Sequence, residues 1–205
     1  MKKKQRMLRG KEKLNPELGD QYIFLSMCAD SKLIINHRIG KRDGDNAIQF
    51  MADLSSRLSS RVQLTTDAFS PYEWAAECAF GDAVDYATLT KIYKTNGAGR
   101  GRYAPPEIQE VISTVINGSP DPFKVSTSYI ERLNLSMRME MRRLTRLTNA
   151  FSKKLSNLKA AMALQVAWYN FGRVHGSLRV TPAMEAGITD HIWTMDVFTS
   201  IRHVL

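Results

Sequence analysis

The stretch Arg61-Val-Gln-Leu-Thr-Thr-Asp67, followed closely by Ser70-Pro-Tyr-Glu73, decides the fold class of this chain. Val62, Leu64 and Thr66 alternate with polar residues, which is the period-two pattern of a β-strand. The second stretch has a serine followed three residues later by a glutamate, with proline at the first helical position, and this spacing is typical of a helix N-terminus. A core strand that leads directly into a capped helix indicates an α/β fold.

The residues on both sides of this stretch predict further strands and helices. Before it, aromatic and apolar runs predict a hairpin of two strands, 21–27 and 32–39, and residues 43–58 have the spacing of an amphipathic helix. After it, the helix of the opening stretch should end at Gly81, and a strand is expected at 85–93. This order predicts one mixed sheet with helices packed on it.

Beyond these elements we expect an irregular insertion and a helical C-terminal part. Residues 95–122 are rich in glycine and proline, and we predict at most one short strand there, around 111–116. An amphipathic helix is predicted over 126–148, and a second long helix, apolar on more than one side and therefore mostly buried, over 155–171. A short helix should follow from Thr181. The apolar stripe predicted for the first of these helices consists of Ile130, Leu133, Met137, Met141 and Leu144.

The composition points to a polyanionic partner. The chain has 205 residues, a formal net charge of +9, a pI near 9.7 and no apolar run long enough to cross a bilayer. Nucleic acid is the first candidate and an anionic membrane surface the second, while a basic protein without such a partner is the open alternative. The basic N-terminus lacks the apolar core of a signal peptide, and Cys28 and Cys78 lack metal-site or disulfide spacing. We therefore expect a cytoplasmic protein with reduced cysteines.

Two carboxylates lie where chemistry is expected in such a fold. Asp67 ends the core strand directly before the turn into the helix, and ligand sites of open α/β sheets collect at such strand ends. Glu131 lies in the first turns of the next long helix and is followed at +3, +7 and +11 by Asn134, Arg138 and Arg142. Such a stripe could hold a divalent metal next to arginines at phosphate-contact range. An ordinary aspartate in a turn, and a glutamate on a solvated helix face favoured by the helix dipole, remain open interpretations.

A concentrated run of basic residues follows Glu131. Between Arg132 and Lys154 there are seven basic side chains against one acid, Glu140. These are Arg132, Arg138, Arg142, Arg143, Arg146, Lys153 and Lys154. Such a concentration repels itself unless an anion is present, and a DNA backbone would supply that anion through salt-sensitive contacts. His175, further along, could contact a phosphate or the metal site, or it could be a structural histidine.

Four stretches together resemble the transposases of insertion sequence one and its relatives, a family of mobile-element enzymes with an RNase H-like catalytic core. They are residues 61–69, 126–138, 145–154 and 169–184. The segment Ile130-Glu-Arg-x-Asn-Leu135 with the downstream Phe151-Ser-Lys is the most specific part. The Tyr-Asn…His…Thr-Pro ending is shared more widely among transposase and integrase-like chains. The likeness spans about 19–193 and implies an RNase H-like mixed sheet with flanking helices.

The resemblance implies roles for the candidate residues. Asp67 would match the second and Glu131 the third acidic residue of the family's catalytic triad, whose carboxylates hold Mg²⁺ in a two-metal site for DNA strand cleavage and transfer. Asn134 and His175 would support that site. DNA, both transposon ends and target, would contact Arg138, Arg142, Arg143, Arg146, Lys153 and Lys154. A homo-oligomer in the transposition complex is implied as well, and no membrane.

One departure from the family pattern matters. Relatives carry the first acidic residue in an Asp-Glu-x-Trp stretch on the first strand, and no such stretch occurs in this sequence. We therefore interpret residues 1–18 as a basic tail or a remnant of that strand, and 19–205 as the catalytic domain. The first strand is central in an RNase H-like sheet, so its loss would remove a metal ligand and open a gap in the sheet. This chain alone is then expected to be inactive.

Three functional hypotheses stay open on the sequence. The first is a transposase that cuts and joins DNA. The second is an inactive remnant that still binds DNA or partners with intact transposase. The third is a basic nucleic-acid-binding module with no nuclease ancestry. The first two require Asp67 and Glu131, sixty-four positions apart in the sequence, to converge on one metal site.

Overall fold

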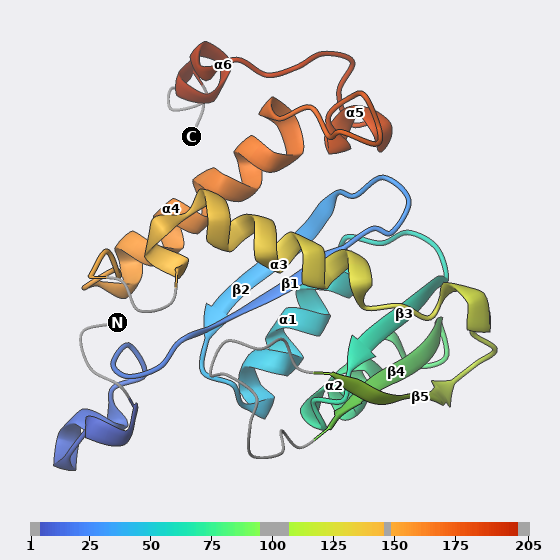
Figure 1. Ribbon diagram of the computed structural model, residues 1–205, viewed down its shortest axis with the longest axis horizontal. Helices are drawn as coiled ribbons and strands as arrows, with labels where there is room; N and C mark the ends of the chain where they lie inside the picture. Colours follow the sequence, from blue (N-terminus) through green and yellow to red (C-terminus); the bar gives the residue numbers. More distant parts are fainter. Residues whose placement is uncertain (1–4, 95–106, 146–148, 201–205) are drawn as a thin grey trace. The chain divides into compact units, whose positions relative to one another are not determined.

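The computed structural model describes residues 5–94, 107–145 and 149–200 (Figure 1). The chain divides into two compact units, which we describe separately. The first unit comprises Met1–Arg42 and Tyr129–Leu205, and the second unit comprises Asp43–Ser128. Together they contain the predicted succession of strand, strand, helix, strand, helix, strand and then helices, so the α/β class is confirmed.

The first unit is built on an antiparallel hairpin of β1 (Tyr22–Met27) and β2 (Ile34–Gly40). The hairpin was predicted at these positions and is confirmed. Its apolar face packs against α3 (Ser128–Glu140) and α4 (Leu155–Ala167). The shared core consists of Ile34, Ile39, Leu133, Met137, Met141, Leu155, Leu158, Met162 and Tyr169. The buried members from α3 belong to its predicted apolar stripe, because residues three and four apart share one face of a helix.

Besides this apolar packing, one polar side chain forms hydrogen bonds between the C-terminal helices and the hairpin. Beyond α4 the helix continues as a π-helical turn, Trp168–Gly172, and this turn buries Asn170. The Asn170 amide accepts a hydrogen bond from the Ile34 N–H at 3.0 Å and donates one to the Ile34 carbonyl at 2.9 Å. A side-chain amide has the same donor and acceptor pair as a peptide group. Asn170 therefore occupies the place of a neighbouring strand at this point of β2.

Short segments complete the first unit at its two ends. Residues 5–14 form two short 3-10 helices, and the Lys41 ammonium donates to the Gln5 side chain at 2.9 Å and to the Asp20 carbonyl at 3.1 Å. At the other end, α5 (Pro182–Glu185) begins at the predicted Thr181, whose hydroxyl caps the Met184 N–H at 3.2 Å. The last described helix is α6 (Met195–Ser200).

The second unit contains a mixed three-stranded sheet in the order β3-β4-β5. β3 (Val62–Asp67) runs parallel to β4 (Val84–Tyr93), and α2 (Pro71–Phe80) connects them. β5 (Ile108–Asn117) pairs antiparallel with the other edge of β4. Val84 and Tyr86 of β4 are buried against Ala76 of α2, and α1 (Gly44–Ser56) packs on α2. The parallel β3-α2-β4 connection confirms the strand-to-helix unit predicted from residues 61–80.

The sheet differs from the prediction in being divided. We predicted one mixed sheet, whereas the described residues form the two-stranded sheet β1-β2 and the separate three-stranded sheet β3-β4-β5. The segment predicted as an irregular insertion also contains more structure than expected, because β5 is ten residues long. Its isoleucines and valines lie on both faces of the strand, so the alternation that marks a half-buried strand is absent. Residues 95–106 of that segment lie outside the described part.

Two helices also depart from their predicted form. The helix predicted over 126–148 ends at Glu140 and is followed by a 3-10 turn, Arg142–Leu144. The Thr145 hydroxyl donates a hydrogen bond to the Arg138 carbonyl at 3.2 Å, and Met141, at the start of this turn, stays in the core. The second helix begins at Leu155 as expected but is not mostly buried, since Leu164 is 57% exposed. Many of its remaining apolar residues are alanines, which lose little by facing water.

The capping box predicted at the start of α2 does not form, because Ser70 makes no capping hydrogen bond. Ser70 itself has helical backbone angles, although Pro71 occupies the first helical position as predicted. A serine caps only with an extended backbone, because its hydroxyl must reach a free N–H in the first turn. Gly81 ends the helix as predicted, with a φ of +52°.

Candidate nucleic-acid interface and carboxylates

Asp67 lies where the sequence placed it, at the carboxyl end of β3. Its backbone pairs with Leu89 of the parallel strand β4, and its side chain is exposed. The Asp67 carboxylate accepts a weak hydrogen bond from the Phe69 N–H at 3.3 Å, which shapes the turn into α2. Behind it, the Thr66 hydroxyl and the Tyr86 phenol lie 2.8 Å apart, and burial raises the pKa of Tyr86 to about 12. The carboxylate thus lies exposed at the carboxyl end of β3.

Glu131 lies in the first turn of α3, and its side chain is exposed. Asn134 follows one turn later and is half-buried, and Arg138 lies in the last turn. Arg142 falls beyond the end of the helix, so the predicted stripe at +11 is wrong: the chain has left helical periodicity by then. Glu131 belongs to the first unit and Asp67 to the second, so their convergence stays a prediction.

The Mg²⁺ site implied by the resemblance would need few protein ligands. Mg²⁺ prefers six oxygen ligands and is bound in proteins through one or two carboxylates together with water or phosphate. Within residues 5–94, 107–145 and 149–200, no group of three or more His, Cys, Asp or Glu side chains is placed to hold a metal ion. A site that uses Asp67 and Glu131 together with water or phosphate stays a prediction.

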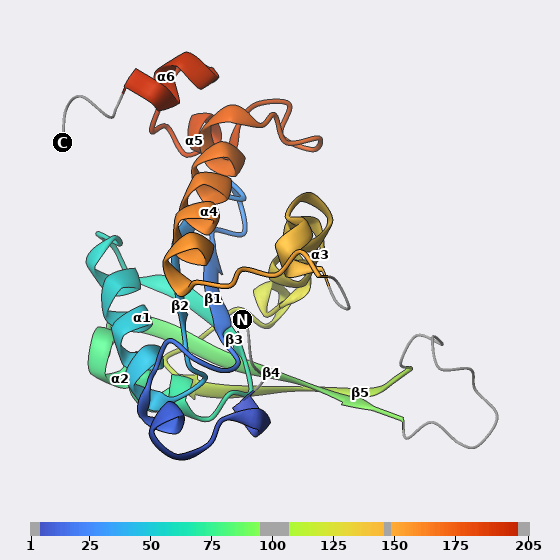
Figure 2. The ribbon, with the colours of Figure 1, turned by 90° about the vertical axis from the view of Figure 1, so that its left-hand side faces the viewer.

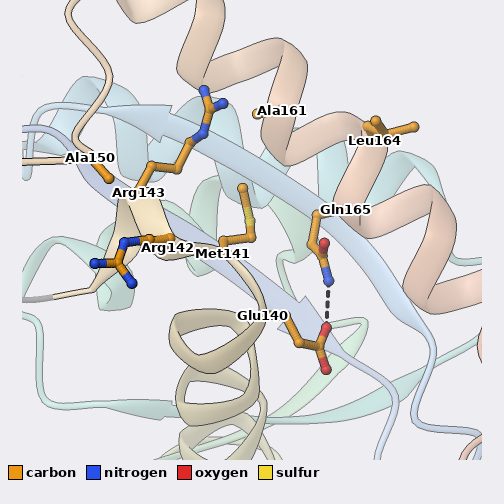
Figure 3. A pocket seen from close by; sticks show the side chains of 8 residues that line it. All are labelled: Glu140, Met141, Arg142, Arg143, Ala150, Ala161, Leu164 and Gln165. Carbon is orange, nitrogen blue, oxygen red and sulfur yellow. Dashed lines mark hydrogen bonds between the residues drawn. The ribbon is translucent and has the colours of Figure 1, made fainter.

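Two residues of the basic run after α3 line an open hollow of about 370 Å³ (Figure 3). Its walls come from the end of α3, the following turn and α4, and they include Arg142, Arg143 and Ala150. Arg142 and Arg143 extend in different directions from adjacent positions, as Figure 3 shows. Arg143 has a structural contact, because it donates to the Ser152 hydroxyl at 3.1 Å and to the Asn157 carbonyl at 3.3 Å. These bonds hold the arginine against the first turn of α4.

The single acid of this run is neutralised by residues outside it. Glu140 pairs with Arg173 and accepts a hydrogen bond from the Gln165 amide at 2.5 Å (Figure 3). Its charge is therefore already balanced, and it does little to offset the arginines that follow. The other predicted DNA contacts of this segment, Arg138, Arg142, Lys153 and Lys154, are exposed. Arg146 lies outside the described residues.

The start of α4 adds a second feature that favours an anion. The helix has no side-chain cap at its N-terminus, where Lys154 occupies the N-cap position. The first N–H groups of a helix carry partial positive charge and bind anions when they are not capped. Lys153, Lys154 and Arg143 therefore lie around a helix end whose own dipole has the same sign.

His175 lies among cations rather than among carboxylates. Burial lowers the pKa of the His175 imidazole, and the positive charges of Lys32, Arg173 and Arg132 lower it further. The Lys32 ammonium stands over the Tyr129 ring, 3.6 Å from its centroid. The backbone of His175 also closes a local turn, since its N–H bonds the Val180 carbonyl at 2.9 Å. This surrounding suits a phosphate contact better than a metal ligand, because a metal would be repelled by the same cations.

One basic hollow was missed by the sequence interpretation. Arg38 and His37 of β2 and Lys159 of α4 line a second open hollow of about 440 Å³. Arg38 and Lys159 are 121 positions apart in the sequence, so no local spacing connects them. Only the packing of α4 on the hairpin brings them together.

Comparisons with protein-family models, with curated proteins and with solved structures gave no significant match for this chain. No helix in the described part combines the length and the apolar character that a bilayer span requires.

Proposed function

We propose that this chain is the RNase H-like region of an insertion-sequence transposase, with Asp67 and Glu131 as two of the acidic residues of its strand-transfer site. The observation that carries the proposal is the position of Asp67 at the carboxyl end of β3, the first strand of the parallel β3-α2-β4 unit. Glu131 in the first turn of α3 fits the third acidic position. Functional groups of open α/β sheets concentrate at such strand ends.

The division of the sheet supports the same proposal. An RNase H-like sheet places its first strand between a hairpin and the later strands. The described residues have a hairpin, β1-β2, and a parallel pair, β3-β4, in two separate sheets. Two sheets are expected when the first strand is not among the described elements.

DNA binding through the basic residues after α3 is the part of this function that the described side chains support best. Arg138, Arg142, Lys153 and Lys154 are exposed, and the acid among them is already paired. The uncapped start of α4 offers backbone N–H groups to the same phosphates. Such contacts fix the position of a duplex without reading its sequence.

A second candidate, a transposase segment that binds DNA but does not cut it, is favoured by the sequence, which contains no Asp-Glu-x-Trp stretch. We therefore expect little or no Mg²⁺-dependent cleavage of duplex DNA by this chain. Nicking assays on the wild type, Asp67→Asn and Glu131→Gln decide between the candidates, with the exposed turn residue Asp30→Asn as the control. Strong cleavage that survives both carboxylate substitutions would contradict the assignment of Asp67 and Glu131.

Reversing three charges in the basic segment should weaken DNA binding on the order of a hundredfold at low salt. The variant is Arg138→Glu, Arg142→Glu and Lys154→Glu, and each lost phosphate contact should reduce the slope of log K against log salt by about 0.9. The measurement is fluorescence anisotropy of a labelled duplex across a salt series.

The control for this variant has the same change in net charge at another place. It carries Lys11→Glu, Lys13→Glu and Lys124→Glu, three exposed lysines outside the basic segment. We expect it to bind DNA with nearly the wild-type salt slope. Equal losses in the two variants would mean that net charge alone attracts DNA, and the basic segment would then not be the interface.

A further inference from the structure

The β4-β5 pair extends beyond the rest of its sheet as a two-stranded ribbon. β3 pairs with β4 only from Val84 to Leu89, whereas β4 continues to Tyr93, opposite Ile108 of β5. Figure 2 shows the two strands continuing side by side past the end of β3. An isolated two-stranded ribbon is marginally stable in water, so this extension needs support from another surface.

β5 exposes apolar side chains on both of its faces. Within the regular stretch of β5, Ile112 lies on one face of the strand and Val111 and Val115 lie on the other, while Ile108 and Ile116 lie at the irregularities near its two ends. All five are exposed, Val111 to 51% and Val115 to 59%. Ile92 and Tyr93 of β4 are exposed on the same ribbon. Scattered exposed apolar residues need no explanation, but a contiguous group of this kind marks an interaction surface.

Between Glu110 and Val115, the outer edge of β5 lacks the features that keep edge strands apart. β5 ends the strand order of its sheet, and the described residues supply no further strand beside it. Proteins protect such edges with lysine, proline or a bulge, and Ile108–Asn117 contains no lysine, arginine or proline. The irregularities in its pairing with β4 lie at the two ends, so the stretch from Glu110 to Val115 is regular.

The charge of this strand identifies the kind of partner. Glu110 is the only charged residue in β5, so the strand offers no cation to a nucleic-acid backbone or to an anionic lipid surface. The strand suits a partner that presents an apolar strand edge of its own. A second copy of this chain presents such an edge through the same ten residues.

We propose that β5 pairs antiparallel with the β5 of a second copy across a two-fold axis perpendicular to the sheet. Such an axis keeps each side chain on its own face, so each residue is placed opposite one an even number of positions away. With Ile112 opposite its own copy, Val111 is opposite Ser113 and Glu110 is opposite Thr114, all within the regular stretch. Shifting the register by two residues toward the start of the strand would place Glu110 opposite Ile112. The chosen register therefore opposes Ile112 to its own copy and leaves the Glu110 carboxylate beside a hydroxyl.

This pairing would join the three-stranded sheets of two copies into one continuous six-stranded sheet and provide the outer backbone edge of each β5 with hydrogen-bond partners. It does not depend on the proposed DNA chemistry, since it uses no basic residue and neither candidate carboxylate. A dimer that forms without DNA is therefore expected whether or not the chain binds DNA.

Ile112→Lys should weaken self-association about tenfold or more, because it brings two ammonium groups together at the two-fold axis. Sedimentation velocity of the full chain over a concentration series measures the dimer, and circular dichroism checks that the fold is retained. Leu164→Lys, at an exposed apolar position on α4, is the control and should dimerise like the wild type. A wild type that is monomeric at every concentration, or a dimer that Ile112→Lys leaves unchanged, would overturn the proposal.

Cysteine cross-linking tests the register and does not rely on the lysine variant being folded. In a background with Cys28→Ser and Cys78→Ser, Ile112→Cys should form a disulfide-linked dimer on mild oxidation, because directly opposed Cα atoms lie about 5 Å apart. Gln109→Cys should not, since residue 109 would be opposite Val115 and about 20 Å from its own copy. Equal cross-linking at both positions, or none at Ile112→Cys, would refute this pairing.

Discussion

Asn170→Ala should lower the free energy of unfolding of the first unit by about 2–5 kcal/mol. The Asn170 side chain is 5% exposed and makes two hydrogen bonds to the backbone of Ile34, which is itself 2% exposed. Alanine would remove both bonds and leave the Ile34 N–H and carbonyl buried without partners, at about 1–3 kcal/mol for each group. No water can easily replace the amide, because the surrounding core residues are apolar.

Urea denaturation followed by circular dichroism measures this loss. Asn157→Ala is the matched control, because Asn157 is exposed on α4 and its side chain faces solvent. We expect that control to stay within about 0.5 kcal/mol of the wild type, as surface substitutions usually do. A loss below about 1 kcal/mol for Asn170→Ala would show that the two hydrogen bonds are not essential to the packing of this turn.

Asn170→Asp separates the two hydrogen bonds. The aspartate can still accept from the Ile34 N–H, but when ionised it faces the Ile34 carbonyl without a proton to donate. Burial and that carbonyl should raise the pKa of the new carboxyl above its usual value. Its stabilising protonated form is then fully present at low pH and is lost as the pH rises through the raised pKa. The variant should therefore be least destabilised in acid, the opposite of the usual behaviour of carboxylates.

Gly118→Ala should destabilise the second unit by roughly 2–4 kcal/mol, counting left-handed backbone strain and a steric clash. Gly118 has a φ of +68°, and an added Cβ would lie 2.2 Å from an Asp85 carboxylate oxygen and 2.6 Å from the Arg61 guanidinium. These two groups form a bidentate ion pair, with N–O distances of 2.9 and 2.7 Å, and the Ser119 N–H donates to the same carboxylate at 2.8 Å. The glycine therefore leaves room for the contact that ties the end of β5 to β3 and β4.

Two other glycines separate the strain from the clash. Gly187 has the same φ of +68° but no atom within 4 Å of an added Cβ, so Gly187→Ala measures the strain alone. Gly176 has neither strain nor a neighbour there, and its alanine variant should be close to neutral. Thermal unfolding of the three variants gives the comparison. If Gly118→Ala and Gly187→Ala lose equal stability, the close approach of Asp85 is not a constraint.

The ion pair under Gly118 should persist into acid. The hydrogen bonds from Arg61 and then from Ser119 lower the pKa of Asp85 to about 2. A carboxyl with a lowered pKa stabilises the folded state above its unfolded value of about 3.9 and loses that effect as the pH falls toward 2. The comparison of the glycine variants is therefore best made near neutral pH, where the contact is complete.

The local sequence pattern predicted those strands and helices that bury only one face. The hairpin, α1, β3, α2 and β4 were predicted within a few residues, because their apolar residues recur at strand or helix spacing and their ends carry Asp43, Pro71 or Gly81. β5 was mistaken for an irregular insertion, because apolar residues on both faces remove the alternation. The end of α3 at Glu140 was missed, since no glycine or proline marks it and the turn is set by what Met141 buries.

The candidate site divides in the same way. Asp67 and Glu131 could be placed on a strand end and a first helical turn from spacing alone, and both positions are confirmed. Spacing alone could not reveal the structural hydrogen bonds of Arg143, the pairing of Glu140 with Arg173 or the cations around His175. Each of them joins residues whose separation in the sequence matches neither the strand nor the helix repeat.

By itself, the sequence determined the order of strands and helices, the faces they bury and the concentration of positive charge after α3. These depend on spacings of two to four residues, over which the backbone geometry of a strand or a helix is fixed. Only the tertiary structure decided that Asn170 replaces a strand beside Ile34, 136 positions away, and that β5, a largely apolar strand, ends its sheet. Such features depend on which surfaces pack together, and the free energy of that packing belongs to the whole folded chain rather than to any local segment.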